Sequence, residues 1–367
     1  MRAKTKLALE EAGATAFLFT AAIYLYYLTA AWGISDYLAD GIFKDYVQGP
    51  GVHLEALITG LGFGLLLFVV NHIAESNRLR RLPFGYIILL KTGLYLVSLA
   101  LVGILVNIVL LLFVISGEEA AALRETVTPR FAISAGVWII FSILVINSIL
   151  VVRRKVGPGN LVALLTGRYQ HPHLENRLFL FLDLNGSTAI AERLGPKEYS
   201  RFVRQCFHDL TDIVLHYGAQ IYQYVGDEVV LSWLAGNPEA TTRCIHSFFA
   251  FEKKLREKKD WYDRQFGVYP LFRGGVEAGP VTATEVGDIK REIAFHGDTL
   301  NTAARLLDLC KEFGQDLLVS GSVEKAVSKS PGFVTQWQGE IALRGKRNKI
   351  PVYSINQDLQ FDADNCS

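Results

Sequence analysis

The sequence predicts an all-α transmembrane bundle in the N-terminal part and an α+β domain in the C-terminal part. Half of the 367 residues are hydrophobic, and long apolar runs dominate residues 14–152. Residues 168–367 carry most of the charge and mix strand-like with helix-like patterns. This segregation is typical of a membrane domain joined to a soluble domain, because one soluble domain of average composition would spread its charge more evenly.

Composition changes along the chain predict the domain boundaries. Gly157-Pro158-Gly159 interrupts any helix that leaves the last apolar run, and the pattern at 160–169 predicts a short amphipathic helix. The predicted divisions are a four-helix transmembrane domain at 1–152, a linker with a short helix at 153–175, a soluble domain at 176–357 and a C-terminal tail at 358–367.

Four apolar runs reach the length of about 20 residues that a helix needs to cross a bilayer. The third is longer, so we expect it to begin at the interface, where Lys91 reaches the lipid headgroups. His53 and His72 lie at the two ends of the second run, either as interfacial histidines or as ligands of a sensory site. The predicted spans are 14–34, 52–73, 84–115 and 131–152.

Basic residues predict the orientation of these spans. They cluster before the first span, between the second and third, and after the fourth, while the other two loops are acidic. The positive-inside rule therefore predicts a multi-pass protein of the inner or plasma membrane, in contact with lipid, with both termini and the soluble domain in the cytoplasm. The basic residues are Arg2, Lys4, Lys6, Arg78, Arg80, Arg81, Arg153, Arg154 and Lys155.

Cysteine spacing and net charge exclude several classes of protein. The cysteines show no CxxC spacing, which indicates reduced thiols rather than disulfides or a zinc site. The formal net charge of +1 and the absence of a basic stripe argue against nucleic acid as a partner. The cysteines are Cys206, Cys244, Cys310 and Cys366.

The soluble part alternates strands and helices in an α+β order, with one tight hairpin at Gly226-Asp227. Two further pieces close the chain and end in the strand-like "IPVYSI". The predicted strands are 178–184, 220–225, 228–234, 271–277 and 280–286, and the predicted helices are 187–217, 238–258 and 299–312.

Two aspartates stand where apolar strands end. Asp183 follows the strand of "FLFLDLNGST", and Asp227 lies at the tip of the hairpin "YVGDEVVLSW". If these strands are neighbours, both carboxylates project from one edge of the sheet, where a divalent cation such as Mg²⁺ would relieve their repulsion. The alternatives are a helix N-cap or turn role for Asp183 and plain turn chemistry for Asp227.

Two later segments carry groups suited to a nucleotide. In "HGDTLNTAARLLDL" we expect Asp298 to cap the helix, and Asn301 and Arg305 share one face, where they would orient a sugar and hold a phosphate. In "LRGKRNK", Arg344 and Lys346 would reach phosphates. The alternatives are a surface helix with a salt bridge and a solvated charged loop.

Together these segments resemble the class III nucleotidyl cyclases, the adenylate and guanylate cyclase catalytic domain, over roughly 176–357. "FLDLNGST" and "YVGDEVV" resemble the two metal motifs, "FRGGVEAGPV" the central strand, "HGDTLNTAARL" the ribose-orienting helix and "LRGK" the phosphate-contacting segment. The resemblance implies a ferredoxin-like core and a head-to-tail homodimer with the active site between the protomers.

The resemblance also implies roles for individual residues. Asp183 and Asp227, with the backbone of Leu184, would bind two Mg²⁺ or Mn²⁺ ions in one protomer. Asn301 and Arg305 of the other protomer would be catalytic. The implied substrate contacts are Gly186, Ser187, Thr188, Gln223, Ala294, Arg344 and Lys346.

Base selection departs from the family pattern, because Gln223 and Ala294 match neither the adenine-selecting nor the guanine-selecting pair. The resulting hypothesis is a membrane-bound adenylate cyclase that converts ATP to 3′,5′-cAMP and pyrophosphate, with an unknown signal for the bundle. The alternatives are a guanylate or mixed-specificity cyclase that uses GTP, a catalytically silent membrane receptor or scaffold, and a diguanylate cyclase suggested by "VGDEVV".

Overall fold

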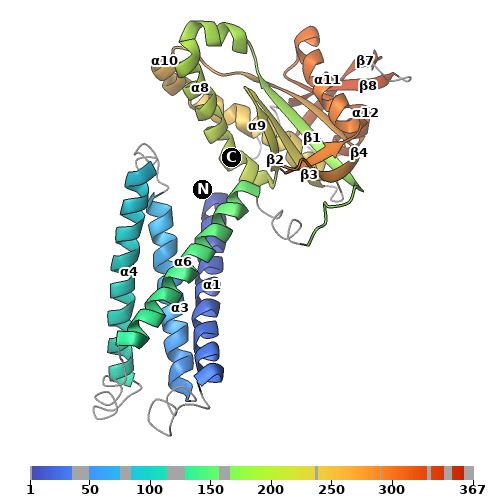
Figure 1. The fold of residues 1–367 in the computed structure, drawn as a ribbon. Helices are drawn as coiled ribbons and strands as arrows, with labels where there is room; N and C mark the ends of the chain where they lie inside the picture. The colour runs from blue at the N-terminus through green and yellow to red at the C-terminus, as the bar shows by residue number, and fades with distance from the viewer. Residues whose placement is uncertain are drawn as a thin grey trace. The chain divides into compact units, whose positions relative to one another are not determined.

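The computed structural model describes residues 2–34, 49–74, 84–113, 129–156, 166–235, 239–289, 291–328, 332–342 and 349–358. The chain divides into two compact units, one of Thr5–Lys155 and one of Val156–Ser367 together with Met1–Lys4. Figure 1 shows both units. Of the linker helix predicted at 160–169, residues 160–165 lie outside the described residues, and 166–169 form a turn rather than a helix.

The N-terminal unit consists of long helices, so the helical prediction for all four apolar runs is confirmed. By hydropathy and length, two described stretches qualify as membrane spans, Ala8–Thr29 and His53–Ile73, and two shorter apolar stretches are Gly93–Leu105 and Gly136–Leu150. That the helices cross a membrane stays a prediction. The helices are α1 (Arg2–Ile34), α3 (Pro50–Ala74), α4 (Phe84–Phe113) and α6 (Pro129–Val156).

Small residues bring α1 and α3 into close contact. A Cβ atom on Gly60 would clash with the backbone of Thr20, and one on Gly64 would clash with the backbone of Ala16. Glycines four apart share one helix face, and this spacing is common where membrane helices pack closely. The apolar core of the unit is formed by Phe19, Phe63, Leu67, Val102, Ile146 and Leu150.

Polar side chains meet in the interior of this bundle. Lys91 Nζ donates to Asn71 Oδ1 at 3.0 Å, and the Tyr95 hydroxyl donates to the same oxygen at 2.9 Å. Asn71 Nδ2 donates to Asn147 Oδ1 at 3.2 Å. The expected headgroup contact of Lys91 is therefore replaced by a bond within the bundle, because an amide oxygen on α3 lies within its reach.

The C-terminal unit is built on a mixed sheet with strand order β2-β3-β1-β4-β6-β8-β7, and β5 pairs with β4. β4 and β6 are parallel, and the other pairs are antiparallel. The elements are β1 (His173–Leu184), α8 (Ser187–Tyr217), β2 (Gln220–Val225), β3 (Glu228–Leu234), α9 (Glu239–Glu257), α10 (Lys259–Phe266), β4 (Phe272–Val286), β5 (Glu292–His296), α11 (Asp298–Phe313), β6 (Leu317–Ser320), α12 (Gly321–Val327), β7 (Phe333–Ile341) and β8 (Ile350–Gln357).

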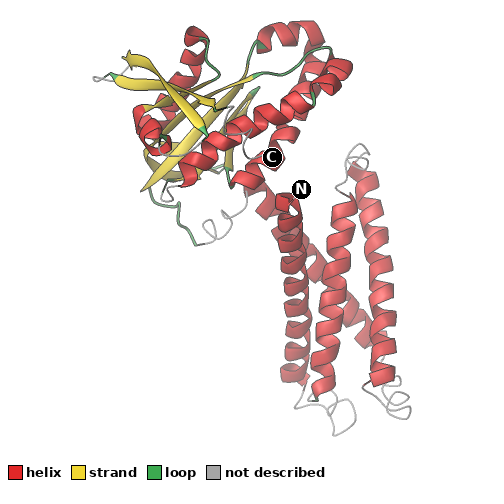
Figure 2. Ribbon diagram, turned by 180° about the vertical axis from the view of Figure 1, so that it is seen from behind, coloured by secondary structure: helices red, strands yellow, loops and turns green. Residues whose placement is uncertain are grey.

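Helices cover both faces of this sheet, as Figure 2 shows. Side chains of β1 alternate between the faces. Leu178, Leu180 and Leu182 pack with α8 and α9, whereas Phe179 and Phe181 pack with α11. α11 approaches so closely that a Cβ atom on Gly275 of β4 would clash with its backbone.

The structure corrects two local predictions and confirms the hairpin. The predicted strands 271–277 and 280–286 form one strand, β4, because β1 pairs with it continuously from Phe272 to Ala283. Asp298 is not the N-cap of α11, since Gly297 holds that position and Asp298 lies in the first turn. The Gly226-Asp227 turn forms as predicted, with Gly226 at φ +64°.

Candidate active site

The fold brings the two strand-end aspartates together. β1 and β3 are antiparallel neighbours, and Leu182 lies opposite Val229. Asp183 follows Leu182, and Asp227 lies in the turn immediately before β3. The end of β1 and the tip of the hairpin therefore meet at one edge of the sheet. Side chains of a strand alternate between its two faces, so Asp183 lies on the same face as Phe179 and Phe181, which is the face that α11 covers.

The two carboxyl groups influence each other strongly. Burial is the largest cause that raises the pKa of Asp183, to about 6, and the charge of Asp227 is the next. A hydrogen bond from the backbone of Leu184 acts in the opposite direction. Without a cation, the folded protein therefore holds a proton at Asp183 more tightly than an ordinary aspartate does.

The donor set fits a hard divalent cation. Asp227 Oδ2 is buried and finds no hydrogen-bond donor among the described residues. A buried carboxylate oxygen without a partner is costly unless a cation or water satisfies it. In the described part of the chain, no three His, Cys, Asp or Glu side chains converge closely enough to hold a metal ion. Mg²⁺ is suited to such a site, because it takes one or two carboxylates together with water and substrate phosphates.

The start of α8 presents backbone N–H groups next to these carboxylates. Gly186, at φ +70°, is the N-cap of α8 and offers no side-chain cap, so Ser187 and Thr188 begin the helix beside the end of β1. Uncapped N–H groups and the helix dipole favour negative charge at this point. A polyphosphate would therefore find backbone donors within a few residues of Asp183.

Three side chains that the sequence did not identify interact electrostatically with the aspartate pair, namely Tyr199, Glu228 and Asp308. Burial, and next the charge of Asp227, raises the pKa of Tyr199 of α8 to about 12, while a hydrogen bond with Ser187 lowers it. Burial and the charges of Asp183, Asp308 and Asp227 raise the pKa of Glu228. Only the position of Glu228 beside Asp227 was a signal in the sequence; the contributions of Tyr199 and Asp308 depend on packing.

Asn301 and Arg305 lie on the outer side of α11. Thr302, Ala303 and Leu306 are buried against the sheet, whereas Asn301 is exposed and Arg305 is half-buried. Neither side chain forms a hydrogen bond or ion pair with another described residue. Both are thus available to a ligand or to a second protein chain.

Comparison with known proteins assigns the fold to a family. The sequence profile of the adenylate and guanylate cyclase catalytic domain matches residues 170–357, half of the chain. This chain belongs to that family. The cyclase domain accordingly comprises all the strands of the C-terminal unit, and the family match favours the class III hypothesis over the diguanylate cyclase hypothesis.

Relatives of the cyclase domain include named adenylate cyclases. Adenylate cyclase 2 of Rhizobium meliloti is 35% identical over 208 residues, which cover 56% of this chain and 57% of that protein. The adenylate cyclase of Anabaena cylindrica is 26% identical over 48% of this chain and 36% of that protein. The matched part of this chain thus covers little more than half the length of the first relative and about a third of the length of the second.

A solved structure has the same fold. A bacterial light-regulated adenylyl cyclase superposes with a TM-score of 0.51 and 21% identity, over 60% of this chain and 65% of that chain.

Gln223 and Ala294, which the sequence resemblance predicts to face the base, lie on β2 and β5. Gln223 is exposed on β2, and Ala294 is half-buried on β5. The residues beside them touch, since the Phe295 amide donates to the Tyr222 hydroxyl at 3.4 Å. Arg344 and Lys346 lie outside the described residues, so their predicted phosphate contacts stay predictions.

Proposed function

We propose that this protein is a membrane-anchored adenylate cyclase that converts ATP to 3′,5′-cAMP and pyrophosphate at a homodimer interface. The observation that carries the proposal is the meeting of Asp183 and Asp227, with the buried Asp227 Oδ2 lacking a donor among the described residues, beside the uncapped start of α8. A carboxylate pair next to an anion site is suited to a metal-bound nucleotide.

Different residues of the chain have different roles in the proposed in-line displacement at phosphorus. Asp183 and Asp227, with the Leu184 backbone, would hold two Mg²⁺ or Mn²⁺ ions, which supply charge neutralisation at the attacking and leaving oxygens. The first turn of α8 at Gly186, Ser187 and Thr188 binds and orients the triphosphate. This positions the substrate for attack by its 3′-hydroxyl on the α-phosphate.

A second protomer completes the proposed site. Asn301 would orient the ribose, and Arg305 would stabilise the charge that develops on the phosphate. Their freedom from partners among the described residues supports a role across an interface. The hairpin next to Asp227 also exposes Ile221, Tyr224 and Val225, an apolar surface suited to contact with a second copy of the chain.

The proposal names ATP because the Rhizobium and Anabaena relatives are named adenylate cyclases. Gln223 carries both a donor and an acceptor, so it is able to pair with either base, and Ala294 offers no side-chain hydrogen bond. We expect a preference for ATP with measurable use of GTP.

The test is to give ATP and GTP separately to the purified protein with Mn²⁺ and to identify the product by chromatography. Formation of cAMP as the main product supports the proposal. A main product of cGMP would make the protein a guanylate cyclase, and a cyclic dinucleotide would revive the diguanylate cyclase hypothesis. No product from either nucleotide would favour the silent receptor or scaffold.

We further propose that the N-terminal unit is a four-span membrane domain. Its helices expose large apolar side chains, such as Phe17, Leu65, Leu105 and Ile140, each at least 48% exposed, whereas Asn71 is buried at 6%. Apolar residues outside and polar residues inside suit a lipid environment better than water. The basic residues at both ends of this domain and between the second and third helices support a cytoplasmic cyclase domain, by the positive-inside rule.

Membrane fractionation tests this proposal. The full chain is expected to stay in the membrane pellet after an alkaline carbonate wash and to be released by detergent. Release by carbonate alone would contradict the spanning domain and would leave only a peripheral association.

A further inference from the structure

A buried ion pair lies on the α11 face of the sheet, far from the aspartate pair. Arg177 Nε donates to Glu175 Oε2 at 2.8 Å, and the two residues are only 2% and 7% exposed. Arg177 lies six positions before Asp183 along β1, which corresponds to ~20 Å. Arg177 therefore plays no part in the proposed metal site of its own protomer.

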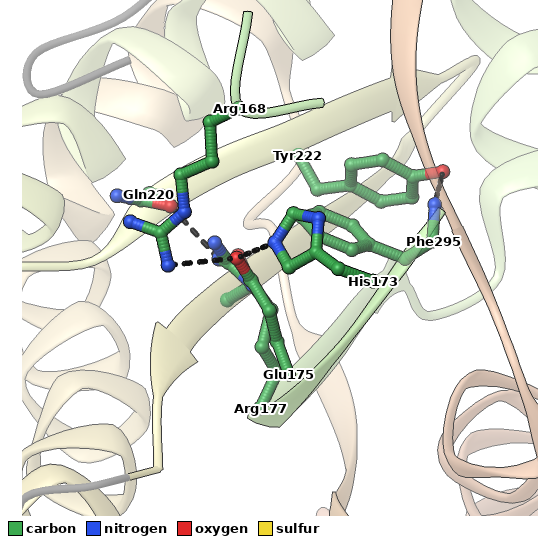
Figure 3. A network of polar contacts seen from close by, with 8 residues as sticks. Arg168, His173, Glu175, Arg177, Gln220, Tyr222 and Phe295 are labelled. Atoms are coloured by element: carbon green, nitrogen blue, oxygen red, sulfur yellow. Dashed lines mark hydrogen bonds and ion pairs between the residues drawn. The ribbon is translucent and has the colours of Figure 1, made fainter. Parts of the chain in front are cut away.

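The guanidinium of Arg177 connects β1 to three other strands, and Figure 3 shows its hydrogen bond to Gln220 of β2. Its Nη1 donates to Gln220 Oε1 on β2 at 2.9 Å and to Ser232 Oγ on β3 at 3.2 Å. Its central carbon lies 4.3 Å from the ring centroid of Phe295 on β5, in a cation–π arrangement.

These contacts end next to the two base-selecting positions. Gln220 precedes Gln223 by three residues on β2, and Phe295 directly follows Ala294 on β5. The Tyr222 and Phe295 rings lie 5.1 Å apart and join β2 to β5. Because Ala294 has no polar side chain, recognition of the base depends on the positions of the β5 backbone and of the Gln223 side-chain amide.

Loss of one partner of a buried ion pair is costly, because the other charge is left buried and uncompensated. A buried pair often adds no stability compared with apolar side chains of similar size, and its retention then suggests a role in geometry. Glu175 also accepts from His173 at 2.8 Å and lies 3.3 Å from Arg168, so its charge is well compensated. The planar guanidinium fork, which lysine lacks, is what connects the separate strands.

We propose that Arg177 is a positioning residue for the nucleobase, which it serves by fixing β2 through Gln220 and β5 through Phe295. The inference rests on the proposed cyclase function, because that function makes Gln223 and Ala294 the base-facing positions. Base selectivity in this chain then depends on the contacts of Arg177 as well as on Gln223 and Ala294 themselves.

Two variants of the 367-residue chain test the proposal. Arg177→Lys keeps the positive charge but loses the planar guanidinium. Gln220→Ala removes only the hydrogen bond from Arg177 to β2, so this second variant can be tested even if the first does not fold. Both are expected to raise the KM for ATP by roughly 5- to 10-fold, to leave kcat within about 2-fold, and to bring the KM values for ATP and GTP closer together. Arg201→Lys is the matched control, since exposed Arg201 pairs with Glu198 at 2.8 Å.

A merely structural role would change thermal stability or kcat but not the ratio of the two KM values. The proposal is overturned if the folded Gln220→Ala protein keeps both KM values, or if kcat alone falls. Equilibrium binding of non-hydrolysable ATP and GTP analogues with Mn²⁺ gives a second readout. If the wild-type protein forms no cyclic product, the proposed function fails, and the ratio of the two analogue affinities in wild type and variants still decides the role of Arg177.

Discussion

Replacing Asp183 by asparagine is expected to lower the rate of cyclic nucleotide formation by about 10²–10³-fold or more, the loss typical of removing one preorganised electrostatic contact. The same substitution should make the metal-free protein more stable. The carboxylate of Asp183 is half-buried beside that of Asp227, and asparagine removes the repulsion between them at little change in volume.

The stability gain has a defined pH dependence. The pKa of Asp183 is about 6 in the folded protein, compared with about 3.9 for an unfolded aspartate. Between these values the folded state binds more protons, so the stability of the metal-free protein falls as pH rises from about 4 to about 6, and the full penalty is present above that range. Burial also raises the pKa of Glu228. The stability of the Asp183→Asn variant is therefore expected to fall with pH as well, but with a smaller slope.

Thermal unfolding in EDTA between pH 4 and pH 8 measures this effect. The melting temperature of the wild type should fall with pH more steeply than that of Asp183→Asn. Adding Mn²⁺ at neutral pH should raise the wild-type value and leave the variant nearly unchanged. Asp263→Asn, on the exposed side of α10, is the control. Equal stabilisation of wild type and Asp183→Asn by Mn²⁺ would contradict the metal assignment.

The second large effect concerns the shared site. Asp183→Ala and Arg305→Ala proteins are each expected to be nearly inactive alone, because every site in their homodimers lacks one essential group. Co-expression should restore activity to about a quarter of the wild-type rate, since random pairing makes half of the dimers mixed and each mixed dimer has one intact site. The measurement is cAMP formation by the co-purified pair.

A mixture of two variants damaged in the same half-site is the control. Asp183→Ala combined with Asp227→Ala should remain inactive, because every site then contains an altered aspartate. Absence of recovery in the Asp183→Ala and Arg305→Ala mixture, with mixed dimers demonstrated by two affinity tags, would show that both groups act within one protomer.

Local patterns in the sequence were sufficient to predict much of the cyclase domain. The continuous apolar run before Asp183 predicted the core of β1, and the glycine of Gly226-Asp227 predicted a turn that needs positive φ. The helix predicted at 187–217 matches α8 despite the kink at Gly195 and Pro196. The candidate residues Asp183, Asp227, Asn301 and Arg305 came from motif order, which needs no tertiary information.

What the sequence by itself determined is therefore the periodic elements, their order and the residues able to carry the chemistry, since these depend on neighbours within a few positions. Only the tertiary structure decided that β4 is one strand, that Lys91 bonds to Asn71, that Tyr199 joins the aspartate pair and that Arg177 lies on Phe295. Each of these depends on strand register and helix packing between segments far apart in the chain. No local period encodes which distant side chain will satisfy a buried polar group.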